Sequence, residues 1–432
     1  MTVPAGRAPR AIMRAMATAL LLLPLAVACR DKGAAPGGGP YASKVAELVP
    51  KIEAATGMRF KSTPVVATRS QAEVRVFLEQ QFASSRAAKE LAGQQQAYRL
   101  FGFLEEGTDL KRLFMDLLAE QVVGYYDPKA RTLYVVQDAP IEAVSITLMH
   151  ELVHALQDQY INVDSIQQLA YDNDRATAAK AVLEGQATFE HVTLMLGGRT
   201  LAEGLPGGWD MIRQQIRDNK TSMPRLAAAP MLIQETLLFP YLAGAEYIRS
   251  FKAAHPGQSP LTDMPRSTRQ VLHSAKFLAG RDSLPLRLVL PAPSGGEVVY
   301  ANDLGEFETR LWLYQYTKDQ GSAGRGAMGW NGDAYQVVKT SRGNALVWLT
   351  LWDSNVEAGE FFGLVNETVV TRFTPKDYFR SGEGGRRYVE GGRSMTIRPV
   401  TVRGLPGVLW IDAPAGATVD LDIAKVTLSR PR

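Results

Sequence analysis

The chain has 432 residues, of which 46% are hydrophobic and 21% are charged, a composition typical of a globular protein with room for two domains. Its formal charge is +4, but Arg7, Arg10 and Arg14 supply three of these charges from the N-terminal segment, which leaves +1 for the remainder. Because no basic stripe with interleaved aromatics is visible, we expect no nucleic-acid partner.

The first 28 residues, 1–28, predict a secretory signal peptide, with three arginines before an apolar run that is too short for a stop-transfer helix. The run ends in "LAVAC" at Cys29, the only cysteine, and resembles the lipobox of bacterial lipoproteins, in which this cysteine carries the lipid. The alternative is an ordinary signal peptide with an incidental cysteine. Residues 29–41 are rich in Gly, Pro and Ala and predict a flexible tether to a membrane. Arg30 in place of an aspartate favours the outer membrane, if the organism has one.

Residues 41–121 predict mainly helices. Apolar residues recur at helical spacing in "YASKVAELVPKIEAATG", in "QAEVRVFLEQQFASSRAAKELAG" and in "TDLKRLFMDLLAEQ", where Thr108 is a plausible N-cap. "RFKSTPVVATRS" is strand-like, and "VVGYYDPKARTLYVV" predicts a β-hairpin. The second hairpin strand, "TLYVV", suggests a sheet edge that could pair with an extended substrate, although a strand inside the sheet would look the same.

The next helix, "SITLMHELVHALQDQY", is predicted to begin near Ser145 and contains His150, Glu151 and His154. Positions i and i+4 share one helix face, so both imidazoles can point at one metal ion. Glu151, one step around the helix, is placed to contact a water held by that ion and to take its proton during attack on a carbonyl. The alternative is an amphipathic helix with two interface histidines and an exposed glutamate.

A catalytic zinc needs a third protein ligand. The following long helix, "YDNDRATAAKAVLEGQATFEHVTLMLGG", offers Glu184, and the small residues Gly185 and Ala187 would let this helix approach its neighbours closely. Glu190 and His191 are fallback ligands on the same helix. The alternative for Glu184 is a solvated helix charge.

His150-Glu151-x-x-His154 together with Glu184-Gly185-x-Ala187 resembles the gluzincin metallopeptidases, the thermolysin-like superfamily. The resemblance implies Zn²⁺ bound by the two histidines and Glu184, with Glu151 as general base. Asp158 matches an acidic residue that follows the second histidine in thermolysin-like enzymes. Thr188 stands where those enzymes have an aspartate that orients a histidine, so the group that fixes the tautomer of His150 is open.

Several motifs between about residues 122 and 362 resemble motifs of secreted bacterial proteins without an assigned function. They are "VVGYYDPKARTLYVV", "HELVHALQDQ", "LEGQAT", "FPYLAGAEY", "RSTRQVLHSAKF" and "GWNGDAY" with a later "WDS". Peptide hydrolysis creates an oxyanion that a Tyr or His donor usually helps to stabilise. Two candidates are His273, in "TRQVLHSAKF", and Tyr241, which is predicted to begin the helix "PYLAGAEYIRSFKAAH". Their alternatives are a capping or surface histidine and a core tyrosine.

The last third predicts an α+β module: a hairpin around "SRGN", a helix over "NVEAGEFFGLVNETVV", and short β runs. The expected fold class is α+β: a zincin-like, mainly helical metallopeptidase domain with a small β-sheet, followed by a smaller α+β domain of unknown role. The predicted domains are a lipoprotein signal peptide at 1–28, a tether at 29–41, a gluzincin-like domain at 42–280 and the C-terminal domain at 281–432.

These features predict an extracytoplasmic zinc metallopeptidase that is anchored to the membrane of the cell envelope through Cys29 and acts on a protein or peptide substrate. The alternative is a non-catalytic envelope lipoprotein that keeps the zinc site as a structural element. In that case the C-terminal module would bind a partner, with Trp330, Asp333, Trp348 and Trp352 as candidate surface residues.

Overall fold

The computed structural model describes residues 41–83, 85–167, 172–197, 224–282, 284–382 and 384–430. The predicted signal peptide and lipidated Cys29 lie outside the described residues. The described chain is mixed α+β, which confirms the coarse fold class. Among these residues, no helix combines the length and the apolar character needed to cross a bilayer.

The chain forms two compact units, each assembled from separate stretches of sequence. Unit 1 takes the described parts of Met1–Ala88, Asp109–Gln168 and Ala178–Pro265, and unit 2 takes those of Lys89–Thr108, Leu169–Thr177 and Arg266–Arg432. The predicted domain ranges are contiguous, so they divide the chain at other places than these units do.

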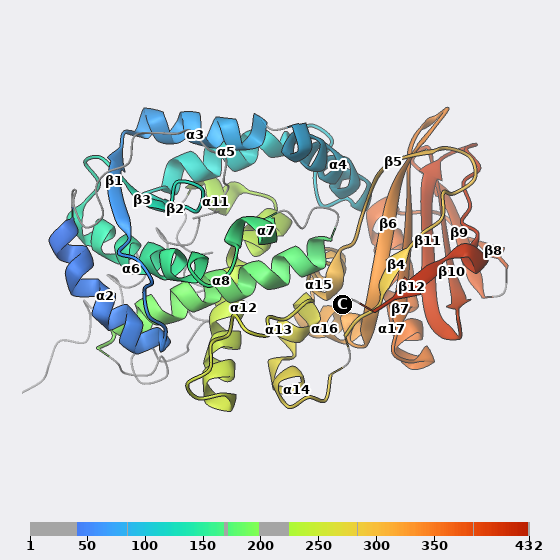
Figure 1. The fold of residues 1–432 in the computed structure, drawn as a ribbon. Coiled ribbons are helices and arrows are strands. Elements are labelled where there is room, and N and C mark those ends of the chain that lie inside the picture. Colours follow the sequence, from blue (N-terminus) through green and yellow to red (C-terminus); the bar gives the residue numbers. More distant parts are fainter. Residues whose placement is uncertain are drawn as a thin grey trace, which may run out of the picture. The chain divides into compact units, whose positions relative to one another are not determined.

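Unit 1 consists of helices and one small sheet (Figure 1). Its elements are α2 (Ala42–Thr56), β1 (Val65–Arg69), α3 (Gln71–Ala83), α5 (Leu110–Gln121), β2 (Gly124–Asp127), β3 (Thr132–Val136), α6 (Ile141–Asp158), α7 (Val163–Gln167), α11 (Pro224–Ala228) and α12 (Met231–Ala254). Two further helices, α4 (Ser85–Phe101) and α8 (Asn173–Met195), run through segments assigned to both units.

The small sheet has the strand order β1-β3-β2. The predicted hairpin is present, because β2 pairs antiparallel with β3, while β1 pairs with β3 in parallel. The prediction of "TLYVV" as a sheet edge is wrong, since this strand is β3 and has a neighbour on each side. An inner strand has no free row of backbone N–H and C=O groups to offer a substrate.

Three helix starts differ from the prediction. Helix α5 is capped by Asp109 instead of Thr108, and the Asp109 carboxylate accepts from the Arg112 N–H. Helix α6 begins at Ile141, one turn before Ser145, because the Pro140 carbonyl accepts from the Val144 N–H and so opens the helix earlier. Helix α12 begins at Met231, so Tyr241 lies in its interior instead of at its start.

Helices α8 and α12 cross at glycines. A Cβ added at Gly185 would lie 2.2 Å from the backbone carbon of Gly244, and one added at Gly244 would lie 2.0 Å from the Ala181 carbonyl oxygen. Gly185 thus permits a close helix approach, as predicted, and the helix that it meets is α12. This packing holds α8 in place beside the elements that carry the candidate site.

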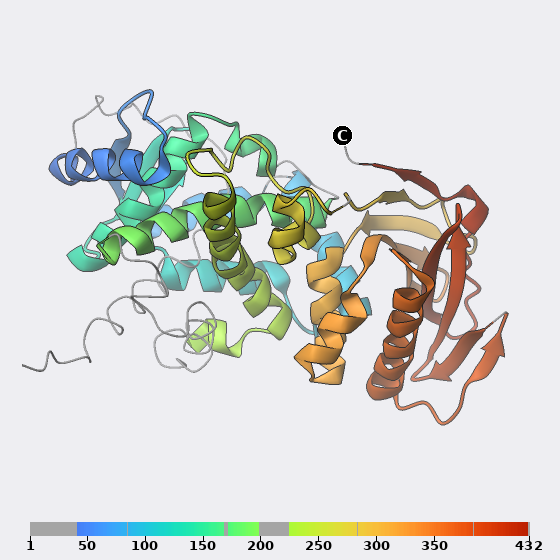
Figure 2. The same cartoon turned by 90° about the horizontal axis from the view of Figure 1, so that it is seen from below.

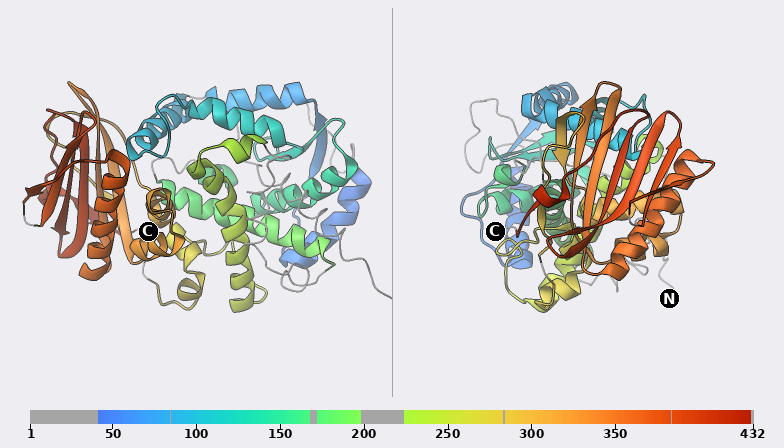
Figure 3. Two further views of the ribbon diagram at one scale, coloured as in Figure 1. Left: turned by 180° about the vertical axis from the view of Figure 1, so that it is seen from behind. Right: turned by 90° about the vertical axis from the view of Figure 1, so that its right-hand side faces the viewer.

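Unit 2 is built on a seven-stranded sheet of order β5-β6-β7-β11-β10-β9-β8, antiparallel throughout. The right-hand panel of Figure 3 shows this sheet. The elements are α13 (Thr268–Leu272), α14 (Ser274–Leu278), β4 (Arg287–Val289), β5 (Glu297–Asn302), α15 (Gly305–Thr317), α16 (Gln320–Ala327), β6 (Trp330–Thr340), β7 (Gly343–Trp352), α17 (Asn355–Phe373), β8 (Phe379–Ser381), β9 (Gly385–Glu390), β10 (Arg393–Val402), β11 (Leu405–Pro414), a 3₁₀ helix (Ile423–Lys425) and β12 (Thr427–Ser429).

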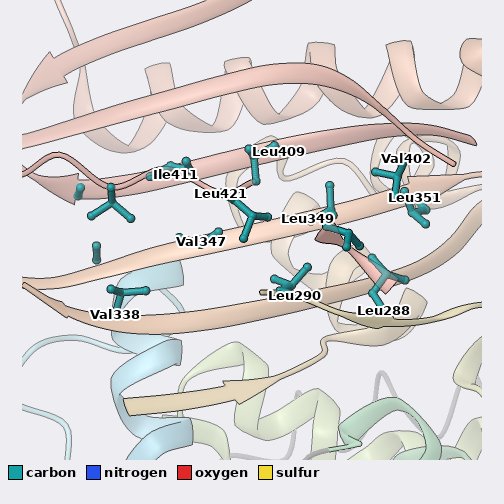
Figure 4. Packing of buried hydrophobic residues seen from close by; sticks show 14 residues of the cluster. Leu288, Leu290, Val338, Val347, Leu349, Leu351, Val402, Leu409, Ile411 and Leu421 are labelled. Atoms are coloured by element: carbon teal, nitrogen blue, oxygen red, sulfur yellow. The ribbon is translucent and has the colours of Figure 1, made fainter. Parts of the chain in front are cut away.

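Both faces of this sheet are covered within unit 2. Helix α17 packs against β7, β10 and β11 on one face (Figure 2). On the other face, alternate strand residues such as Val347 and Leu349 pack with Leu288 of β4 and with Leu421 (Figure 4). A sheet with two buried faces explains the long apolar run of β7, since successive side chains point to opposite faces.

The four residues considered as a partner-binding surface are buried, so that prediction is wrong. Trp330, Trp348 and Trp352 are at most 2% exposed, and Asp333 is 4% exposed. The Asp333 carboxylate accepts from the Trp348 indole N–H at 2.8 Å and from the backbone N–H groups of Leu304 and Gly305. These residues stabilise the core of unit 2, because each indole buries a large apolar area.

Candidate metal centre

The two histidines of α6 lie side by side in the interior of unit 1. The Nε2 atoms of His150 and His154 are 3.1 Å apart, and both residues are at most 5% exposed. Helix α6 packs against β2 and β3, and all its residues from His150 to Gln157 are buried. Two buried imidazoles in contact with each other need polar partners, because burial of a polar nitrogen without a partner is costly.

Glu184 of α8 supplies such a partner. Its Oε2 atom lies 3.2 Å from Nε2 of His150 and 3.3 Å from Nε2 of His154, and the residue is 4% exposed. The three predicted ligands therefore converge through one atom each, although 34 positions separate His150 from Glu184. The prediction of a solvated helix charge at Glu184 is wrong, since the carboxylate is buried.

The three atoms fit a single zinc ion. Ligand atoms about 2.05 Å from a tetrahedral ion lie about 3.3 Å from one another, and the observed separations are 3.1, 3.2 and 3.3 Å. Two neutral imidazoles and one carboxylate are also the donor set of many catalytic zinc sites. A set of His150, Glu151 and His154 has ligand atoms within 4.8 Å of one another, but only Glu184 contacts both histidines through one oxygen.

Glu151 is positioned beside this cluster by strand β2. Its Oε2 accepts a 2.7 Å hydrogen bond from the Tyr126 N–H, while Oε1 is buried and has no hydrogen-bond partner among the described residues. Burial raises the pKa of Glu151 to about 8, the nearby Glu184 adds to this rise, and His154 and the Tyr126 N–H act against it. One carboxylate oxygen is thus fixed, and the other is available for a proton.

The cluster holds a proton in the absence of a cation. Burial lowers the pKa of His154, but Glu184, together with smaller contributions from Glu151 and Gln157, outweighs burial and raises the value to about 9. In turn, burial raises the pKa of Glu184, but the two histidines outweigh it and hold the value at about 2. Because zinc binds the deprotonated ligands, its binding would release this proton.

Gln157, which the sequence interpretation missed, fixes the tautomer of His154. The Gln157 amide nitrogen donates to the Leu183 carbonyl and to Gln186 Oε1, both at 3.0 Å, so its Oε1 is an acceptor. Nδ1 of His154, 2.8 Å from that Oε1, must then be the donor, so Nε2 is the nitrogen that offers its lone pair to a metal ion once the proton of the cluster is released. The only sequence signal was a glutamine three positions after a candidate ligand on a buried helix.

His191 contacts the outer nitrogen of His150. The two Nδ1 atoms are 3.3 Å apart, so His191 is a partner of a predicted ligand and lies behind it. Burial lowers the pKa of His191 to about 3, and the neighbouring His150 adds to this effect, so a neutral ring lies against His150. His191 thus lies at the outer nitrogen of His150, for which the sequence pattern left no partner at Thr188.

Glu190 and Asp158, two other residues that the sequence singled out, pair with side chains outside the His–Glu cluster. Glu190, a fallback ligand, pairs with Lys252 at 2.5 Å, and the carboxylate of Asp158 accepts from the Tyr126 hydroxyl at 2.9 Å. Tyr126 therefore contacts α6 twice, through its backbone at Glu151 and through its hydroxyl one turn beyond His154. These contacts tie β2 to the helix that carries the candidate site.

The two candidate oxyanion donors belong to different units. Tyr241 of α12 lies in unit 1, buried, with its ring 6.1 Å from the His150 ring and inclined by 25° to it. Tyr241 therefore stacks on a candidate ligand. His273 belongs to unit 2, where its Nε2 lies 2.7 Å from Glu306 Oε1.

Comparison with known proteins reaches only unit 2. Residues 295–419 match a family described as "Domain of unknown function (DUF8575)". No curated protein and no solved structure matches the chain. The matched segment contains all seven strands of the large sheet and none of the His–Glu cluster, so the candidate site rests on its own geometry.

Proposed function

We propose that the protein is a zinc-dependent hydrolase of peptide bonds, with a zincin-like metal site in unit 1. The observation that carries the proposal is the convergence of His150, His154 and Glu184 within 3.3 Å, next to a second buried glutamate. A purely structural metal site does not account for the buried Oε1 of Glu151, which lacks a partner among the described residues.

Each residue of the candidate site has a separate role in the proposed hydrolysis. His150, His154 and Glu184 would hold the ion, which supplies Lewis acidity, lowering the pKa of water and polarising a carbonyl. Glu151, held through Oε2 by the Tyr126 N–H, takes a proton from the attacking water at Oε1. The same oxygen then delivers the proton to the leaving amine nitrogen, so that the carboxylate is regenerated.

The envelope location is a proposal from the N-terminal sequence alone. Lipidation of Cys29 would place the tethered body outside the cytoplasm. The tryptophans that the partner-binding alternative would use are buried in unit 2, so they do not favour that alternative.

The test compares Glu151→Gln with wild type for zinc content and for cleavage of a mixed peptide library. We expect Glu151→Gln to keep zinc and fold but to lose about 10²–10⁴-fold in kcat/KM, the usual contribution of a general base. Glu142→Gln is a matched control, because Glu142 lies in the first, exposed turn of the same helix. Wild-type protein that binds no zinc would contradict the proposal, as would unchanged cleavage by Glu151→Gln.

A further inference from the structure

Unit 2 contains a cavity of about 390 Å³ that the proposed chemistry does not use. Its volume falls in the range of about 300–1,000 Å³ that is typical of small-molecule sites. Its wall is formed by Gln96, Arg99, Leu100, Glu106, Asn344, Arg372 and Arg393. All of these residues belong to unit 2, and the last three lie inside the segment that matches the domain family.

The charges on this wall are unbalanced. Three side chains are arginines, and Glu106 is the one acid among the lining residues. Arg393 is neutralised by Asp412, whose Oδ1 lies 2.6 Å from Nε. Arg99 and Arg372 form no ion pair with any side chain in the described part of the chain, so neither guanidinium group at the cavity has a carboxylate in direct contact.

Backbone carbonyls hold these two guanidinium groups in place. Arg99 Nη2 donates to the Thr108 carbonyl, and Arg372 Nη1 donates to the Leu100 carbonyl, both at 2.7 Å. Such bonds orient a guanidinium group without neutralising it. Nε of Arg99 is buried with no hydrogen-bond partner among the described residues.

Grouping the arginines has an electrostatic cost. Burial lowers the pKa of Arg372 and the positive charge of Arg393 adds to that effect, while Tyr316 and Asp412 act against it without offsetting it. A bound anion would offset both contributions, because it restores the charge balance that the protein side chains leave open.

We propose that this cavity binds a phosphate monoester. Such a group carries about −1.5 to −2 charges at pH 7, which matches the two unpaired arginines, and it has three acceptor oxygens for their N–H groups. A carboxylate would supply one charge and two oxygens. The cavity exceeds the size of a bare phosphate, and the amides of Gln96 and Asn344, joined by a 3.2 Å hydrogen bond, offer polar contacts to the substituent.

The ligand can be a soluble phosphorylated molecule or the headgroup of a phospholipid, and isothermal titration calorimetry distinguishes these two sources. The purified full-length protein is titrated in EDTA, so that phosphate held by a metal at the His–Glu cluster does not contribute. The probes are glucose 6-phosphate, glucose, inorganic phosphate, and phosphatidylcholine vesicles with and without phosphatidic acid. We expect a monoester, as the sugar phosphate or as phosphatidic acid, to bind more tightly than inorganic phosphate, and glucose not to bind.

Substitutions of the lining residues test whether the phosphate monoester binds in this cavity. Arg99→Gln should weaken binding roughly tenfold or more, and Arg99→Lys, which keeps the charge but loses the fork, should weaken it less. Glu106→Gln removes the acid from the wall and should tighten binding, an effect that misfolding cannot imitate. Arg380→Gln removes an exposed charge from the same unit and should have no effect.

Equal loss in Arg99→Gln and Arg380→Gln would overturn the proposal, because the effect would then be one of net charge. It would also be overturned by unchanged affinity in Glu106→Gln, by binding of inorganic phosphate as tight as that of the tighter-binding monoester, or by the absence of binding to any probe.

Discussion

The hydrogen bond from His154 to Gln157 should control zinc affinity, and Gln157→Leu tests this. Leucine removes the acceptor for the Nδ1 proton of His154, so the ring can adopt the tautomer that points N–H at the metal position. Loss of such an orienting partner typically costs 10–100-fold in metal affinity, about 1.4–2.7 kcal/mol. A competition titration with a chromogenic zinc chelator measures this change directly.

The same substitution also lowers stability, and the two effects must be separated. Gln157 makes three buried hydrogen bonds, to His154, Leu183 and Gln186. At about 0.5–1.5 kcal/mol each, their loss should reduce the free energy of unfolding by about 1.5–4.5 kcal/mol. Gln157→Glu keeps the acceptor for His154 and removes the amide donors, so zinc affinity should be retained while stability falls.

Gln159→Leu is the matched control, since the amide oxygen of Gln159 accepts from the backbone N–H groups of Lys61 and Ser62 and does not contact the cluster. The reasoning is refuted if Gln157→Leu binds zinc as tightly as wild type. It is equally refuted if Gln159→Leu and Gln157→Leu lose the same affinity, because the effect would then be a general loss of structure.

Three further predictions follow from packing, titration and targeting. Gly185→Ala forces a Cβ into the backbone of Gly244 and should lower the free energy of unfolding of unit 1 by about 1–3 kcal/mol in urea unfolding. Gly363→Ala is the control and should not destabilise the protein, because its Cβ meets nothing within 4 Å. Equal stabilities of the two variants would contradict this prediction. Burial raises the pKa of Asp174 from its ordinary value of 3.8 to about 7, so its contribution to stability is greatest below pH 3.8 and is lost as pH rises towards 7. Asp174→Asn should therefore make the melting temperature depend less on pH between pH 5 and 8. A variant with the same pH dependence as wild type would count against this prediction. Cys29→Ala should release the protein from the membrane fraction and abolish incorporation of labelled fatty acid, and a lipid-labelled variant would exclude Cys29 as the anchor.

Local features of the sequence were sufficient for several elements. The hairpin of β2 and β3 was predictable because Asp127 opens its turn, and its side chain accepts from the N–H groups of Lys129 and Ala130. The shared face of His150 and His154 follows from helical periodicity alone. The start of α6 was misplaced, because Pro140 lacks the side-chain oxygen by which an N-cap is usually recognised.

The choice among Glu184, Glu190 and His191 depended on tertiary packing. These residues lie on one helix within eight positions, and periodicity assigns them to faces without saying what each face meets. Packing of α8 against α6 and α12 places Glu184 between the two histidines, His191 behind His150 and Glu190 beside Lys252.

The sequence by itself determined the spacing of His150, Glu151 and His154, because that spacing is set within one helix. Only the tertiary structure brought in Glu184 and Gln157, placed β3 inside its sheet and buried the tryptophans of unit 2. The physical reason is that helix and strand periods follow from local backbone geometry, whereas partners across a core are selected by the packing of segments far apart in the chain.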